Sequence, residues 1–161
     1  MSPADKETLS ALTAGILSEV ASYVFYREAA HKTDNDEVKG ILEKLAIEEK
    51  QHFQILERQY DSLVRSEKWI TTADALKQEG LPEIDEDMSR KHQNMIDEVA
   101  NTDSLSEILD IALRLELEAR DLFKVSAGRC QSETGKKMYT QLAGIEEGHA
   151  AKIKDMMKKY C

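Results

Sequence analysis

Residues that interrupt helices are scarce in this sequence. Of its 161 residues, only 2 are Pro and 7 are Gly, and aromatic residues make up 6%. Apolar residues make up 41% and charged residues 33%, so the chain is rich in helix formers and long enough for one domain with a hydrophobic core. We therefore predict an all-α fold.

Basic charge and cysteine are also in short supply. The net charge of -9 and the pI near 5.0 argue against binding to nucleic acid or to an anionic membrane, because both require a basic surface. Small molecules, ions or proteins remain as partners. Cys130 and Cys161 form no C-x-x-C pair, which fits a reducing compartment and leaves open whether either has a redox role.

Long apolar runs are missing as well. The sequence has no uninterrupted run of about 18 apolar residues, and residues 1–10 lack a basic segment followed by an apolar one. Nothing in this pattern indicates a membrane span or a secretory signal. We expect a cytoplasmic protein that does not bind membranes.

One short motif, in contrast, occurs twice. Residues 45–52 read LAIEEKQH and residues 142–149 read LAGIEEGH, so each ends in Glu-x-x-His. The two motifs pair Glu49 with His52 and Glu146 with His149. On a helix, residues three apart share a face, so the carboxylate and the imidazole of each motif can bind one ion.

The spacing of apolar residues predicts four long helices in two hairpins. Hairpin 1 covers about residues 5–66 and hairpin 2 about residues 104–160, with turns near residues 33–37 and 131–135. Between them, residues 67–103 or so have a weaker pattern with several helix breakers, which we interpret as a crossover that contains a short helix. The expected unit is one domain over residues 1–161.

The two hairpins repeat each other at a constant offset. Polar residues inside the predicted apolar stripes recur 97 positions apart, namely Glu19 and Glu116, Glu49 and Glu146, and His52 and His149. Such a repeat without gaps indicates related hairpins packed about a pseudo-twofold axis. It predicts a four-helix bundle with one long crossover.

Four glutamates and two histidines directed into one core require a compensating charge. Removing an ion from water costs several kcal/mol, whereas proteins are stable by only about 5–15 kcal/mol. Two divalent cations would balance four carboxylates and leave the histidines neutral. Oxygen-rich ligands with one imidazole per ion favour iron or manganese, although zinc would also bind. We therefore predict a dinuclear metal site.

Residues 25–52, with the sequence FYREAAHKTDNDEVKGILEKLAIEEKQH and Glu19 upstream, resemble the rubrerythrin branch of the ferritin-like superfamily. Residues 108–149 repeat this resemblance. It implies a ferritin-like bundle with two iron ions, or manganese, zinc or mixed occupancy. It also implies that Glu49 and Glu146 bridge the ions, that Glu19 and Glu116 are terminal ligands, and that His52 and His149 each bind one ion.

The activity implied by the resemblance is reduction of hydrogen peroxide or dioxygen, with a likeness to the short, erythrin-type members. The chain departs from the peroxidase pattern at Ala119, where such members typically carry an extra glutamate. It also lacks the two cysteine pairs of a rubredoxin module, so electrons would come from a separate protein. Iron handling by a ferroxidase reaction, or a metal-stabilised bundle without catalysis, remain alternatives. We expect a homodimer.

Two further side chains have open roles at this level. Tyr23 follows Glu19 by one helical turn, so it is either a hydrogen-bond and proton source at the metal site or an ordinary core tyrosine. Arg120, at the corresponding position in the second half, either pairs with Glu116 or faces water.

Overall fold

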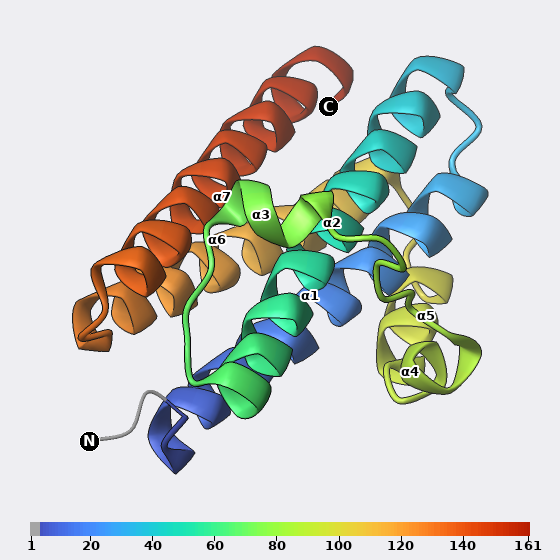
Figure 1. Cartoon of the computed structure of the whole chain (residues 1–161). Coiled ribbons are helices and arrows are strands. Elements are labelled where there is room, and N and C mark those ends of the chain that lie inside the picture. The colour runs from blue at the N-terminus through green and yellow to red at the C-terminus, as the bar shows by residue number, and fades with distance from the viewer. Residues whose placement is uncertain (1–3) are drawn as a thin grey trace.

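Seven helices and no strands are found in residues 4–161, the part of the chain that this computed structural model describes (Figure 1). The all-α prediction is confirmed. Residues 1–3, which belong to the predicted domain and to the stretch considered for a signal, lie outside the described residues. The helices are α1 (Lys6–Lys32), α2 (Asp36–Ser66), α3 (Thr72–Lys77), α4 (Glu86–Arg90), α5 (Gln93–Ala100), α6 (Leu105–Arg129) and α7 (Glu133–Tyr160).

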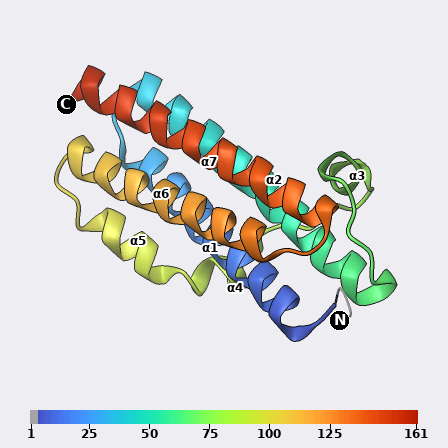
Figure 2. The same cartoon turned by 90° about the vertical axis from the view of Figure 1, so that its left-hand side faces the viewer.

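Four long helices form the bundle. α1 packs along α2 and α6 packs along α7, and each pair is joined by a short turn, so the chain makes two antiparallel hairpins (Figure 2). The hairpins meet where α1 contacts α6 and α2 contacts α7. This arrangement is the four-helix bundle with a long crossover that the repeat predicts.

The long helices begin at polar side chains that cap their free backbone N–H groups. Asp5 accepts a 2.7 Å hydrogen bond from the N–H of Thr8 at the start of α1, and Asn35 accepts one from Val38 at the start of α2. Ser104 and Ser132 do the same for α6 and α7. Because short polar residues compete with the helical backbone, they define where each helix starts.

The bundle core consists of two apolar clusters with a polar layer between them. On α1, Leu12 belongs to one cluster and Val20 to the other, and Glu19 lies at the change between them. On α6 and α7 the buried ligands also lie between residues of the two clusters, and on α2 Glu49 and His52 lie just before the change at Phe53 and Ile55. The apolar residues on both sides therefore keep this layer away from water.

The crossover contains three short helices, so the prediction of a single one is wrong in number. α4 and α5 are separated at Lys91 and His92; α4 has no buried residue, and α5 buries Met95 and Val99. The crossover is fastened to hairpin 1 at both ends. Lys32 donates hydrogen bonds to three backbone carbonyls at the end of α5, and the buried amide of Gln59 pairs with both backbone groups of Ile70.

By length and composition, α1 is apolar enough to cross a membrane. The same composition is expected of a helix buried in a bundle, and α1 packs against α2, α5 and α6. Among its buried residues is Glu19, which is fully inaccessible to solvent. We therefore describe α1 as a core helix.

Candidate metal centre

The structure brings all six candidate ligands together in the polar layer. α1 and α6 contribute one ligand each, and α2 and α7 contribute two each. All six are buried: Glu19 (α1), Glu49 and His52 (α2), Glu116 (α6), and Glu146 and His149 (α7). They form two overlapping sets whose ligand atoms lie within 4.8 Å of one another. Position 1 is defined by Glu19, Glu49, His52 and Glu146, and position 2 by Glu49, Glu116, Glu146 and His149.

At position 1 the imidazole of His52 faces three carboxylates. Its Nδ1 atom lies 2.7 Å from Oε1 of Glu146, 3.6 Å from Oε2 of Glu19 and 3.8 Å from Oε2 of Glu49. The three acids come from three different helices. This convergence of α1, α2 and α7 on one ring nitrogen is what a single cation would require.

At position 2 the imidazole of His149 has the corresponding place. Its Nδ1 atom lies 2.9 Å from Oε1 of Glu49, 3.4 Å from Oε1 of Glu116 and 3.9 Å from Oε1 of Glu146. The rings of His52 and His149 are nearly parallel, with centroids 6.0 Å apart. Glu49 and Glu146 contribute to both sets, so they are the residues able to bridge two ions.

The donor atoms fit a cationic group. Within residues 4–161, six buried carboxylate oxygens of the four glutamates, together with Nδ1 of His52, have no hydrogen-bond partner. Leaving so many buried polar atoms unsatisfied is costly, because each has lost its contact with water. Two divalent cations would satisfy these atoms and cancel the charge of four carboxylates. The residues present therefore suit a dinuclear metal site.

The electrostatics of the unligated cluster agree with this reading. Burial raises the pKa of Glu49 and of Glu146 well above the usual glutamate range, and it raises the pKa of Glu19 to about 8. Burial also opposes a charge on His149, but hydrogen bonds to Glu116 and Glu49 outweigh it and raise the pKa of His149 to about 10. Without cations, the cluster keeps protons that metal ions must displace.

Two side chains outside the ligand set complete position 2. The hydroxyl of Tyr26 donates a 2.5 Å hydrogen bond to Oε1 of Glu116, and Oε2 of Glu48 lies 2.9 Å from Nε2 of His149. A carboxylate on the outer nitrogen of a metal-binding histidine fixes the ring and its tautomer, so that the inner nitrogen is free to bind. Both residues come from hairpin 1, although the ligands that they contact belong to hairpin 2.

The prediction names Tyr23 as the tyrosine at the site, whereas the structure places the hydroxyl of Tyr26 against the ligand cluster. In the described part of the chain, the hydroxyl of Tyr23 has its contact with Arg27, at 3.5 Å, and not with the cluster. Helix geometry explains the difference: at about 100° per residue, Tyr26 lies about 20° from the direction of Glu19, whereas Tyr23 lies about 40° from it. The seven-residue spacing was the signal that could have identified Tyr26.

Two other positions from the sequence are now placed. Arg120 pairs with the exposed acids Asp121 and Glu147, so of its two interpretations the one away from Glu116 holds. Ala119 is buried in the apolar cluster that also contains Leu12 and Phe123, on the side of the layer where α1 begins and α6 ends. Glu48 had no sequence signal, because its partner His149 lies on the other hairpin and 101 positions later along the chain.

A helical bundle with inward Glu-x-x-His motifs on two helices and a further inward glutamate on each of the other two is the arrangement of carboxylate-bridged dinuclear metal proteins. Within that class, the chain belongs to the rubrerythrin family: the family model described as Rubrerythrin matches residues 10–103, more than half of the chain. This match covers hairpin 1 and the crossover. No curated protein and no solved structure gives a significant match.

Proposed function

We propose that this protein is a non-haem di-iron protein that reduces hydrogen peroxide or dioxygen. The observation that carries the proposal is the pair of overlapping ligand sets, joined by Glu49 and Glu146, in the buried layer of a rubrerythrin-family bundle. Shared carboxylates hold two ions close enough to act on one substrate molecule. The family match supports the class of reaction, and the two ligand sets support the binding of the two iron ions that the reaction needs.

The residues around the centre support this chemistry in distinct ways. Two bound iron ions would supply the two electrons that cleavage of a peroxide bond consumes. Glu49 and Glu146 hold the spacing between the positions, and the apolar clusters on either side exclude bulk water. Tyr26 holds a proton on its hydroxyl oxygen against Oε1 of Glu116, beside position 2.

Metal identity and partners are further parts of the proposal. Four carboxylates and two imidazoles are ligands that iron and manganese accept readily, and zinc or mixed occupancy would compete. We propose that the electrons come from a separate donor protein. We further propose a cytoplasmic homodimer.

An anaerobic titration tests the function. Ferrous ion is added to the metal-free protein to two equivalents, one equivalent of hydrogen peroxide follows, and a reductant is then supplied. The expected result is fast oxidation of both ferrous ions by one molecule of hydrogen peroxide, followed by repeated turnover once the reductant is present. An optical spectrum that does not change with peroxide would contradict the proposal and favour a metal that only holds the hairpins together.

Iron handling is the second candidate, and Ala119 favours it. In family members with peroxidase activity that position typically holds a glutamate, whereas here it is a buried methyl group in an apolar cluster. In that case the same titration would oxidise ferrous iron once and show no turnover with the reductant. An Ala119→Glu variant that gained turnover would assign the difference to this residue.

A further inference from the structure

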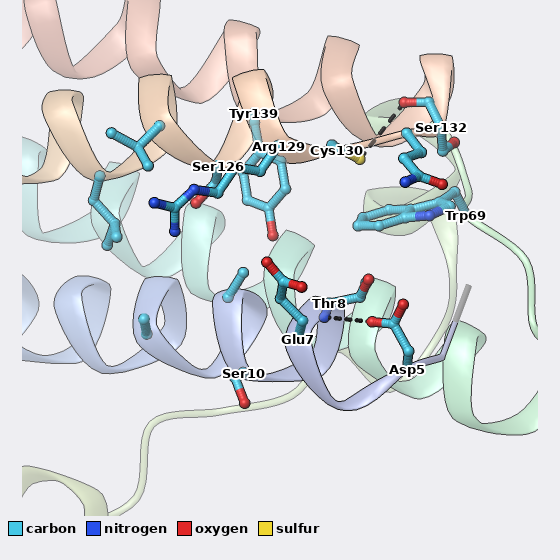
Figure 3. A pocket seen from close by; sticks show the side chains of 15 residues that line it. Asp5, Glu7, Thr8, Ser10, Trp69, Ser126, Arg129, Cys130, Ser132 and Tyr139 are labelled. Atoms are coloured by element: carbon cyan, nitrogen blue, oxygen red, sulfur yellow. Dashed lines mark hydrogen bonds between the residues drawn. The ribbon is translucent and has the colours of Figure 1, made fainter. Parts of the chain in front are cut away.

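A cleft separate from the metal centre lies at the end of the bundle where α1 begins and α6 ends. It has a volume of about 810 Å³, within the range of sites that hold small organic molecules. Its walls come from the first turns of α1, the last turns of α6, the start of α7 and Trp69 in the crossover (Figure 3). None of the six metal ligands lines it.

Tyr139 marks this cleft as a site for a ligand with a polar group. Only 2% of the surface of this tyrosine is exposed, and its hydroxyl has no hydrogen-bond partner in the described part of the chain. Figure 3 shows that the hydroxyl points into the cleft, toward the α1 wall. A buried hydroxyl is normally hydrogen-bonded, so this one has a place for a partner that the protein itself does not supply.

The rest of the cleft is suited to a flat aromatic body. Trp69 meets the ring of Tyr139 edge to face, with centroids 6.1 Å apart, and Ala11, Leu122 and Val125 add apolar surface. Trp69 is seated against Gly135, where an added Cβ would lie 2.8 Å from the indole. Because only glycine allows this approach, the aromatic wall is held in place and does not need to form when a ligand arrives.

The charges at the cleft favour a neutral ligand. Asp5 already accepts the N–H of Thr8 as the cap of α1, which leaves Glu7 on one wall and Arg129 on the other. The Asp5 carboxylate faces the positive end of the α1 dipole, and Glu7 and Arg129 have opposite charges, so the lining has no large excess of charge that would select an ionic ligand. From these features we infer that the cleft binds a small neutral aromatic alcohol or phenol, with its polar group on the hydroxyl of Tyr139.

The protein has its own reporter for this site, because Trp69 is the only tryptophan in the sequence. We suggest titrating the full-length, zinc-loaded protein with 2-naphthol while following the single indole N–H signal by NMR. A saturable shift of that signal is the expected result, with calorimetry giving the affinity. An indole signal that stays in place up to the solubility limit of 2-naphthol would overturn the inference.

Two matched variants on α7 locate the ligand. Tyr139→Phe removes only the hydroxyl and is expected to weaken 2-naphthol binding by about threefold to tenfold. Tyr160→Phe makes the same change at the other end of the helix and is expected to leave binding unchanged. Equal affinity of Tyr139→Phe and the unaltered protein would refute the assigned contact, provided that circular dichroism shows both to be folded.

Discussion

The two hairpins present the same ligands at the same spacing, yet they surround these ligands differently. Tyr26 in hairpin 1 bonds Glu116 of the other half, whereas the position 97 residues later is Phe123, which has no hydroxyl to offer Glu19. In the same way, Glu48 contacts His149, but its counterpart is Ile145. The two halves therefore share their ligands but not the outer contacts of those ligands.

This difference concerns how tightly each ion is bound. Position 2 has an oriented histidine and a carboxylate that accepts a tyrosine hydroxyl, and among the described residues position 1 has neither of these contacts. Outer contacts of this kind typically change metal affinity by about tenfold to a hundredfold. We therefore expect the two positions to fill in sequence, position 2 before position 1, despite their matching ligands.

The largest effect is expected where the two positions share ligands. Replacing both bridging residues, Glu49→Ala with Glu146→Ala, should reduce bound metal from two ions per chain to almost none, because both ligand sets lose two members. Elemental analysis after gel filtration measures the content. Glu147→Ala is the matched control, since Glu147 is an exposed neighbour of Glu146 that pairs with Arg120 and Lys124. Metal retained by the double variant would show that the ligand assignment is wrong.

The unshared glutamates should separate the two positions. Glu19→Ala removes a ligand from position 1 alone, and Glu116→Ala removes one from position 2 alone. Each variant is expected to keep about one ion per chain in a zinc titration against a coloured chelator. The ion that remains should be the tighter one in Glu19→Ala and the weaker one in Glu116→Ala. The same residual affinity in both variants would contradict the proposed difference in metal affinity between positions 1 and 2.

The contact between Glu48 and His149 tests the source of that inequality. Glu48→Ala should weaken zinc binding at position 2 by about tenfold to a hundredfold and leave position 1 unchanged, because only His149 loses its outer partner. Glu43→Ala, an exposed acid on the same helix, serves as the control. A titration in which both steps shift equally would point to a general loss of negative charge and not to the histidine.

A tenfold effect is expected from the tyrosine. Tyr26→Phe removes the hydrogen bond to Glu116, and affinity at position 2 should fall by about tenfold, the cost of one charge-assisted hydrogen bond. Tyr23→Phe is the natural comparison, since its hydroxyl contacts Arg27. If Tyr23→Phe had the larger effect on metal affinity, the original choice of Tyr23 would be restored.

The smallest effect is expected from repairing the weaker half. Ile145 is 43% exposed, so Ile145→Glu is tolerated at the surface and places a carboxylate where the repeat predicts contact with His52. Affinity at position 1 should rise by about threefold to tenfold, and the two steps of the zinc titration should move closer together. Unchanged affinity would mean that the two hairpins are less symmetric around their histidines than their sequences suggest.

The ligands could be predicted because they interrupt a pattern. Glu19 and Glu116 lie within apolar stripes of helical period, and the constant offset between the halves makes chance coincidence a poor explanation. The starts of helices can be predicted for a similar reason, because Ser104 and Asn35 are residue types whose side chains cap helices. In each case the information is local to one helix.

Contacts between distant segments could not be predicted in this way. Glu48 is one of two adjacent acids in its motif, and only the packing of α2 against α7 shows that it meets His149. The seating of Lys32 on the end of α5 likewise depends on where the crossover folds back. One helical turn from Glu19 leads to Tyr23, whereas two turns lead to Tyr26 and return more closely to the direction of Glu19.

Glu19 has a consequence for α1 beyond coordination. It is the only charged residue between Glu7 and Arg27, in a helix that is otherwise compatible with lipid. A charge at the centre of a bilayer is unfavourable, so this carboxylate also opposes insertion of the newly made helix by the translocation machinery. Glu19→Leu would therefore make α1 more hydrophobic at the same time as it removes a ligand, whereas Glu19→Gln removes the charge but keeps a polar group at that position.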